Sequence, residues 1–179
     1  MMIIHFNMIA DNYFEGGKED VTFTRLLEHI KSVKEQNKSI IIKKGVFDLL
    51  HADHIKMFMR MKHIADHVII LTISDHNTSI IKPGRPIIPE YARIQVLKSI
   101  RYIDYVQTDY SSVDSETGKY SRLVDAQKLK LLGVDKFVLS DKTSDLFSGY
   151  DIGDTETIVI PEGSNFSTTG IVQKIRQSS

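Results

Sequence analysis

The sequence predicts an α/β fold in which a doubly wound parallel sheet lies between two layers of helices. Two apolar runs, Ser39 to Ile42 and Val68 to Ile73, show little alternation of polar and apolar residues, as in strands buried on both faces. Between such runs lie segments with apolar residues near helical spacing, beginning with residues 22–36. Strands that alternate with helices in this way are typical of parallel sheets covered on both faces.

The expected elements follow in order along the chain. We expect helices at residues 22–36, 52–65, 89–100, 121–132 and 168–176, and strands at residues 39–42, 68–73, 102–106, 136–139 and 157–160. Residues 1–20 hold several helix breakers, so they are expected to form an irregular N-terminal extension. In open α/β sheets, ligands bind beyond the carboxyl ends of the strands.

Length and composition narrow the class of protein. The 179 residues suit one domain, 1–179, with a sizeable core. No apolar stretch approaches the ~18 residues that a spanning helix needs, and the start, MMIIHF, is too short for a signal peptide, so no membrane partner is expected. A formal net charge of zero gives no indication of nucleic acid binding. The absence of cysteine excludes disulfides and thiolate metal sites and fits a cytoplasmic protein.

The turn after the first predicted strand is the most informative segment. Gly45 ends that strand, where a side chain would hinder close approach of the backbone to a ligand. His51 and His54 follow, three residues apart at the start of the next helix, so both can face one anion. The helix N-terminus adds unpaired N–H groups and a positive dipole end. The segment therefore suits a triphosphate; the alternatives are polar surface histidines, or a metal site that lacks a third ligand.

The run from Gly45 to His54, GVFDLLHADH, resembles the Gly-x-Phe-Asp-x-x-His-x-Gly-His signature of the HxGH-motif nucleotidyltransferases, except at Asp53. Residues 82–106 and 166–175 are similar to two further segments of that family, in the same order. The segment before the loop looks like the corresponding part of heptose-phosphate adenylyltransferases. The resemblance covers residues 22–176 and implies a Rossmann-like fold with three α/β/α layers.

The resemblance also implies an activity: transfer of AMP or CMP from ATP or CTP to a sugar or polyol phosphate, with release of pyrophosphate. Heptose-phosphate and glycerol-phosphate acceptors both remain open, as does the base. Mg²⁺ is expected as the counter-ion of the triphosphate, held by phosphate oxygens and water, and a homodimer is expected. The expected catalytic residues are His51, His54 and Lys82, and the expected nucleotide-binding residues are Gly45, Val46, Phe47, Asp53, Arg85, Ser167, Thr168 and Thr169.

Several of these residues also have a purely structural interpretation. Lys82 would neutralise phosphate, or it is a solvated lysine in a loop. Thr168 and Thr169 would bind triphosphate through hydroxyls and N–H groups, or they only begin a helix that Ser167 caps.

Four charged residues lie in or near these motifs. Arg85 lies in a loop that can close over the site, while Arg93 is expected to pair with a carboxylate. Asp48 is expected to accept backbone hydrogen bonds that hold the loop. Asp104 either lies near the nucleotide or has a structural role at the end of a strand.

Asp53 is the main departure from the family pattern because it puts a carboxylate between two histidines expected to meet an anion. At about 4 Å and an effective dielectric near 20, two unit charges interact by about 4 kcal/mol. Either Asp53 points away and caps the helix, or it recruits Mg²⁺, or the protein is a catalytically silent homologue that only binds nucleotide. Residues 137–145 also depart from the family and indicate an unusual acceptor. The polar segment 107–120 is expected to be a loop on the acceptor side or at an interface.

Overall fold

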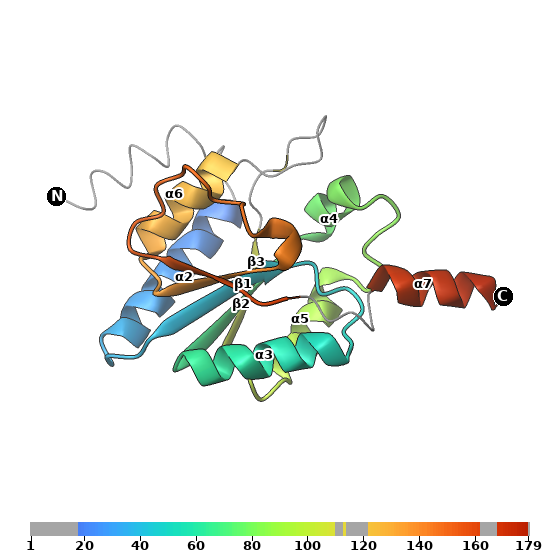
Figure 1. The fold of residues 1–179 in the computed structure, drawn as a ribbon, viewed down its shortest axis with the longest axis horizontal. Coiled ribbons are helices and arrows are strands. Elements are labelled where there is room, and N and C mark those ends of the chain that lie inside the picture. Colours follow the sequence, from blue (N-terminus) through green and yellow to red (C-terminus); the bar gives the residue numbers. More distant parts are fainter. Residues whose placement is uncertain (1–17, 110–112, 114–121, 162–167, 179) are drawn as a thin grey trace.

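Five parallel strands form the centre of the molecule, in the order β3-β2-β1-β4-β5 (Figure 1). The computed structural model describes residues 18–109, 113, 122–161 and 168–178. The strands are β1 (Ile40–Gly45), β2 (His67–Ile73), β3 (Tyr105–Asp109), β4 (Lys136–Leu139) and β5 (Glu156–Val159). The helices are α2 (Lys18–Lys34), α3 (Ala52–Ile64), α4 (Asp75–Ile81), α5 (Glu90–Lys98), α6 (Arg122–Leu132) and α7 (Thr168–Gln177), with a short 3₁₀ helix, η1 (Asp141–Thr143).

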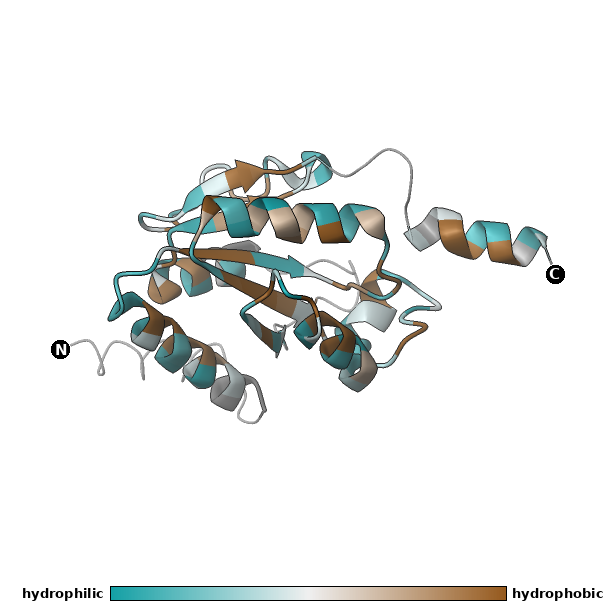
Figure 2. Cartoon of the chain, turned by 90° about the horizontal axis from the view of Figure 1, so that it is seen from below, coloured by the Kyte–Doolittle hydropathy of each residue, from teal (hydrophilic) through white to brown (hydrophobic). Residues whose placement is uncertain are grey.

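Helices cover both faces of the sheet, which confirms the predicted three-layer α/β/α architecture. Alternate residues of β1 point to opposite faces: Ile40 and Ile42 pack against α2 and α6, while Ile41 packs with α3 and α5. All three isoleucines are fully buried, which explains the apolar run in the sequence. Apolar and polar residues are mixed along the covering helices (Figure 2), and buried apolar residues of α2, α3, α5 and α6 pack against the sheet.

Apart from shifts of one to three residues at other element ends and the unexpected short η1, the observed elements differ from the expected ones at three places. The helix expected at residue 22 begins at Lys18, so residues 18–20 are helical; the rest of the expected irregular extension lies outside the described residues. Strand β3 begins at Tyr105, not at residue 102, because the Ile103 N–H closes a turn with the Ile100 carbonyl at 3.0 Å. Helix α4 was not predicted because it is short and polar; its N-cap is Ser74, whose hydroxyl accepts from the Asn77 N–H at 3.2 Å.

Asp104 lies just before β3, at the amino edge of the sheet. Its carboxylate accepts hydrogen bonds from the Val68 N–H at 2.8 Å and from the Lys62 ammonium at 2.7 Å. Parallel strands have their amino ends at one edge and their carboxyl ends at the other. The expectation that Asp104 orients near the nucleotide is therefore wrong, and its structural interpretation is confirmed.

The helical crossover that follows β1 and the one that leads to β4 lie on opposite faces of the sheet. The crossover from β1 to β2 runs through α3, and the crossover from β3 to β4 runs through α6 on the opposite face. Strand β1 pairs with β2 on one side and with β4 on the other. The strand order therefore reverses between β1 and β4, and a crevice for ligands is expected at the carboxyl ends of these strands.

Arg93, on α5, joins that helix to the carboxyl ends of β1 and β2. Its side chain is only 1% exposed. Nη1 donates to the Val46 carbonyl at 2.5 Å and to the Thr72 hydroxyl at 2.7 Å. Nη2 donates to the Ile73 carbonyl at 2.9 Å and to the Asp75 carboxylate at 2.8 Å. The expectation that Arg93 pairs with a carboxylate is confirmed, and the guanidinium also holds the start of the loop that follows β1.

At the amino edge, His29 of α2 meets His67 of β2. Their Nε2 atoms lie 2.9 Å apart, so one ring donates and the other accepts. The His29 ring also stacks on Tyr105, with centroids 3.9 Å apart. Burial lowers the pKa of both histidines below the usual value, against the attraction of nearby Asp104; for His67 the charges of Lys62 and Lys38 lower it further.

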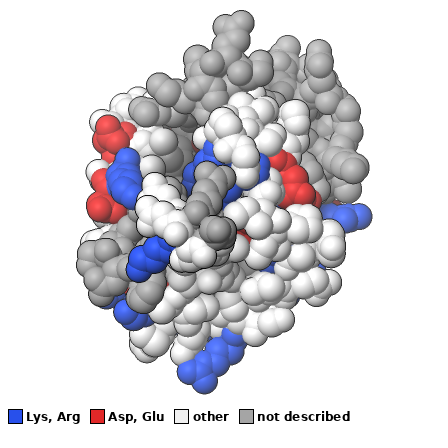
Figure 3. All heavy atoms as spheres, turned by 90° about the vertical axis from the view of Figure 1, so that its right-hand side faces the viewer, with Lys and Arg blue, Asp and Glu red and all other residues white. Residues whose placement is uncertain are grey.

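The surface that faces right in Figure 1 carries α4, α7 and the loop after β1. Lys and Arg side chains are interspersed there with Asp and Glu (Figure 3). Among the described helices, none combines the length and the apolar character that crossing a bilayer requires.

We expect Arg93→Lys to lower the free energy of unfolding by about 3 kcal/mol, because lysine cannot reproduce the planar fork and leaves buried acceptors without a donor. Urea unfolding of the purified variant measures this. Arg101→Lys is the matched control, since Arg101 is exposed on the surface, and it should change stability by less than about 0.5 kcal/mol. Equal stabilities of the two variants would contradict the anchoring role of Arg93.

We expect the free energy of unfolding to fall as the pH drops below 6.5. The unfolded chain takes up protons on His29 and His67 there, while the folded chain, in which both pKa values are lowered, resists protonation. His67→Gln should weaken this dependence between about pH 7.5 and about pH 5.5. His63→Gln, at an exposed position of α3, is the control. If the free energy of unfolding of His67→Gln depends on pH as in the natural protein, His67 does not contribute to this dependence.

Candidate functional site

The loop after β1 begins with a sharp turn at Gly45 and Phe47. Phe47 has a φ of +52°, a left-handed conformation that costs about 1 to 2 kcal/mol for a residue with a side chain. Its ring is buried, lies against Phe58 with centroids 5.6 Å apart, and folds back over Gly45. A Cβ added to Gly45 would lie 2.9 Å from that ring. The structure thus gives a further reason for glycine at position 45: a side chain there would clash with the Phe47 ring, whether or not a ligand approaches.

Asp48 ties this loop to the segment before α5. Its carboxylate accepts from the Ile88 N–H at 2.8 Å and from the Ile87 N–H at 2.9 Å, and it forms an ion pair with Arg85. Burial alone would raise the pKa of Asp48, but these hydrogen bonds and the guanidinium lower it below the usual value. The expected loop-holding role of Asp48 is confirmed. Arg85 uses Nε for this pair, and nucleotide binding by the same side chain stays a prediction.

His51 and His54 stand together at the N-terminus of α3. His51 is the N-cap residue, and its N–H donates to His54 Nδ1 at 3.3 Å. The two ring centroids are 4.0 Å apart, as the three-residue spacing predicts. Because Nδ1 of His54 accepts a hydrogen bond, the neutral ring carries its proton on Nε2. That Nε2–H is a donor suited to a phosphate oxygen.

The first turn of α7 lies beside the same loop. The Thr168 hydroxyl donates to the Leu49 carbonyl at 3.3 Å, although 119 residues separate them. The N-terminus of α7, like that of α3, is therefore near residues 46–51, and helix N-termini favour anions. Ser167 lies outside the described residues, and so does the side chain of Thr169.

Lys82 follows α4, and its side chain is exposed. The Lys82 carbonyl accepts from the Arg85 N–H at 3.0 Å, so the lysine begins the turn that leads to the Asp48 ion pair. The chain from Lys82 to Ile88 is thus attached to the loop after β1. Its exposure makes the Lys82 ammonium accessible both to solvent and to a phosphate.

Asp53 lies in the first turn of α3, and its side chain is 11% exposed. The helix cap is His51, so the expectation that Asp53 caps the helix is wrong. Oδ1 is 3.4 Å from the ammonium of Lys56, whereas Oδ2 is buried and has no hydrogen-bond partner among the described residues. A carboxylate in the first turn is favourable to the helix dipole. A buried carboxylate oxygen without a partner among the described residues costs free energy, which opposes this gain.

Sequence reasoning missed a buried charge cluster on the other face of the sheet. Lys44 of β1 lies 2.6 Å from the Asp109 carboxylate and 3.0 Å from that of Asp125, with all three side chains at most 14% exposed. Burial alone would lower the pKa of Lys44, but the two carboxylates raise it above the usual value, so the ammonium stays charged. Burial and neighbouring Asp109 raise the pKa of Asp125. The sequence feature that could have indicated this cluster is a lysine, Lys44, at the end of an apolar strand.

The chain matches the model of the cytidylyltransferase-like family over residues 42–174. It is 31% identical over 168 residues to a bifunctional protein HldE of Pseudomonas fluorescens, covering 92% of this chain and 34% of that protein. The chain thus spans about a third of this relative's length. It is 29% identical over 149 residues to an FAD synthase of Thermococcus kodakarensis, covering 80% of this chain and 96% of that protein.

Solved structures share the fold at low sequence identity. A pantothenate synthetase of Thermus thermophilus matches with a TM-score of 0.59 at 12% identity, covering 88% of this chain and 68% of that one. A lipopolysaccharide core biosynthesis protein of Thermoplasma volcanium matches with a TM-score of 0.52 at 18% identity, covering 71% and 99%. The family model, the HldE relative and the loop described above agree, and the chain belongs to the cytidylyltransferase-like family of the nucleotidyltransferase superfamily.

Proposed function

We propose that the protein transfers a nucleoside monophosphate from ATP or CTP to a phosphorylated small molecule and releases pyrophosphate. One observation carries the proposal: two segments far apart in the sequence meet residues 46–51, the loop that leads into α3. Asp48 binds the segment from Arg85 to Ile88, Leu49 binds Thr168, and His51 with His54 begins α3. Two helix N-termini and two histidines at one place suit a triphosphate.

The reaction depends on alignment of the reactants and on stabilisation of negative charge more than on a general base. The second pKa of a phosphate monoester is about 6, so the acceptor oxygen is already ionised near neutral pH. It must be placed in line with the α-phosphorus, opposite the leaving pyrophosphate. The Nε2–H of His54 is suited to donate to a phosphate oxygen there, and preorganised donors of this kind contribute several kcal/mol. Lys82 would neutralise charge on the β- and γ-phosphates or on the acceptor phosphate.

Mg²⁺ belongs to the same proposal and would neutralise part of the triphosphate charge. Among the described residues, no three His, Cys, Asp or Glu side chains gather into a metal site. The ion would therefore be held mainly by phosphate oxygens and water, as Mg²⁺ commonly is. A homodimer, which the family resemblance implies, and a cytoplasmic location, which the lack of cysteine fits, complete the proposal.

Sugar and polyol phosphates are the first acceptors to test, because several relatives are HldE proteins. Pyrophosphate release should be measured with ATP and with CTP against a panel of acceptor phosphates. Turnover with one pair identifies the base and the acceptor. Tight nucleotide binding without turnover of any pair of nucleotide and acceptor would refute the transferase proposal.

A second candidate function is nucleotide binding without catalysis, in a scaffold or regulatory protein. The observation that favours it is the buried Oδ2 of Asp53, which has no hydrogen-bond partner in the described part of the chain and lies in the turn where the family has glycine. A carboxylate there opposes an approaching triphosphate unless Lys56 or a metal ion neutralises it.

We expect His54→Ala to lower kcat at least tenfold, which corresponds to about 1.4 kcal/mol of lost transition-state stabilisation. The reason is loss of the Nε2–H donor at the N-terminus of α3. Steady-state pyrophosphate release measures the effect. His63→Ala, at an exposed position of the same helix, should leave kcat unchanged. If both variants retain the native rate, His54 is not in the site.

We expect Asp53→Gly to change kcat by less than about tenfold in an active enzyme, since Lys56 already offsets part of the charge. Asp53→Asn removes the charge without freeing the backbone and separates the two effects. Kinetics with saturating nucleotide measures both variants. Activity that arises only on substitution would instead show that the natural protein is the silent homologue.

A further inference from the structure

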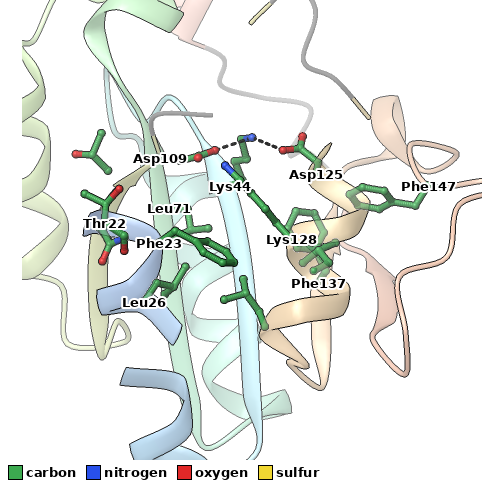
Figure 4. A pocket seen from close by; sticks show the side chains of 14 residues that line it. Thr22, Phe23, Leu26, Lys44, Leu71, Asp109, Asp125, Lys128, Phe137 and Phe147 are labelled. Carbon is green, nitrogen blue, oxygen red and sulfur yellow. Dashed lines mark hydrogen bonds and ion pairs between the residues drawn. The ribbon is translucent and has the colours of Figure 1, made fainter. Parts of the chain in front are cut away.

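The carboxylate of Asp53 has fewer partners than three other carboxylates near the end of β1. Asp48 accepts from two backbone N–H groups and pairs with an arginine. Asp109 and Asp125 share the Lys44 ammonium at 2.6 and 3.0 Å, and Figure 4 shows it between them. Oδ2 of Asp53, in contrast, is buried and has no hydrogen-bond partner in the described part of the chain. The protein therefore compensates the negative charge of Asp53 poorly.

Lys56 is the cation that lies next to Asp53, and it offsets this charge only in part. Its ammonium is 3.4 Å from Oδ1 of Asp53. The Lys56 side chain is 63% exposed and the Asp53 side chain 11%, so solvent screens the lysine more than the carboxylate. An ion pair with so exposed a lysine contributes little.

The position of Asp53 brings its charge close to the proposed triphosphate site. Asp53 lies in the first turn of α3, between His51 at the N-cap and His54 two positions further into the helix. The N-terminus of a helix carries about half a unit of positive charge, whereas the carboxylate brings a full unit of negative charge. Electrostatic interactions over one helical turn are strong where water is largely excluded. Asp53 thus makes this turn less favourable to an anion and more favourable to a cation.

The charge of a nucleoside triphosphate depends on whether Mg²⁺ is bound to it. Near neutral pH the metal-free form carries about four negative charges, and one bound Mg²⁺ leaves about two. A site made only of N–H donors and cations attracts the metal-free form at least as strongly, because that form has the higher charge. A carboxylate reverses this order, since it repels the metal-free form more strongly and attracts the cation.

The residue type at position 53 also fits the ion. Mg²⁺ prefers oxygen ligands, and it keeps several of its waters in most protein sites. A carboxylate can therefore act on it either in direct contact or through one of these waters. Because the charge acts in both cases, a single carboxylate at the start of α3 suffices to favour the metal-bound nucleotide.

We propose that Asp53 makes the site selective for nucleotide that already carries Mg²⁺, over the metal-free form. The inference rests on the proposed function and defines which form of the nucleotide donor is bound. Glycine, which the family pattern has at this position, carries no charge, so the selectivity belongs to this chain and not to the signature it resembles. It also explains how a carboxylate can stand in a triphosphate site without abolishing binding.

The test compares nucleotide binding with and without Mg²⁺. The Kd values of ATP and of CTP are measured by calorimetry without acceptor, in excess Mg²⁺ and in EDTA, at one ionic strength. The quantity of interest is the Kd of the metal-free nucleotide divided by that of the Mg²⁺ complex. We expect this ratio to be at least about tenfold in the natural protein and to fall to about one or below in Asp53→Asn. Asp53→Gly should behave in the same way, and it replaces Asp53→Asn if that variant does not fold.

Two further variants separate charge from a structural effect. A variant that only distorts the site raises both Kd values together and leaves their ratio unchanged. Lys56→Gln removes the partial offset and should raise the ratio, because loss of a positive charge weakens binding of the metal-free form more. Glu28→Gln, at an exposed position of α2 on the other face of the sheet, should leave the ratio unchanged. A lower ratio in Lys56→Gln would contradict the role of charge.

The outcomes distinguish this inference from the proposed function. Equal Kd values with and without Mg²⁺ in the natural protein, or a ratio that Asp53→Asn leaves unchanged, would overturn the inference, while pyrophosphate release would still establish the transferase. A ratio that Asp53→Asn abolishes, without turnover of any pair of nucleotide and acceptor, would support the selectivity and refute the transferase. No binding of ATP or CTP at millimolar concentration in excess Mg²⁺ would overturn both.

Discussion

The buried guanidinium of Arg93 links the parts of the molecule on which the site depends. It binds the Val46 carbonyl, the Thr72 hydroxyl, the Ile73 carbonyl and the Asp75 carboxylate, so one side chain joins α5, β2, the start of α4 and the loop after β1. Backbone carbonyls at strand ends need donors when water is excluded. The Arg93 guanidinium supplies these donors and so fixes the point at which the chain leaves the sheet.

Asp48 holds the next part of the loop that Arg93 anchors. The loop begins with a left-handed phenylalanine, a conformation that needs support from neighbouring structure. The contacts of Asp48 with Arg85, Ile87 and Ile88 provide this support from a segment about forty residues later. A loop held in this way keeps the two histidines in place before any ligand arrives, which lowers the ordering cost of binding.

Two charge arrangements lie near the carboxyl end of β1, and the first of them departs from the family pattern. Asp53 puts a nearly buried carboxylate between the histidines, and Lys44 stands between two carboxylates on the opposite face of the same strand. Asp53 and Lys44 both lie within ten residues of Gly45, so the two arrangements stand on either side of the same strand end.

The sequence by itself determined the fold class, since uninterrupted apolar runs such as residues 68–73 are typical of strands buried on both faces, and the spacing of His51 and His54 put them together on one helical turn. The loop-holding role of Asp48 and the carboxylate partner of Arg93 also followed from their residue types and positions. Only the tertiary structure decided that Asp104 lies at the amino edge, that His51 and not Asp53 is the cap, and that Lys44 meets Asp109 and Asp125. These outcomes depend on strand register and on side chains up to 81 residues apart. Local spacing carries no information on such contacts, because they form only when the sheet has assembled.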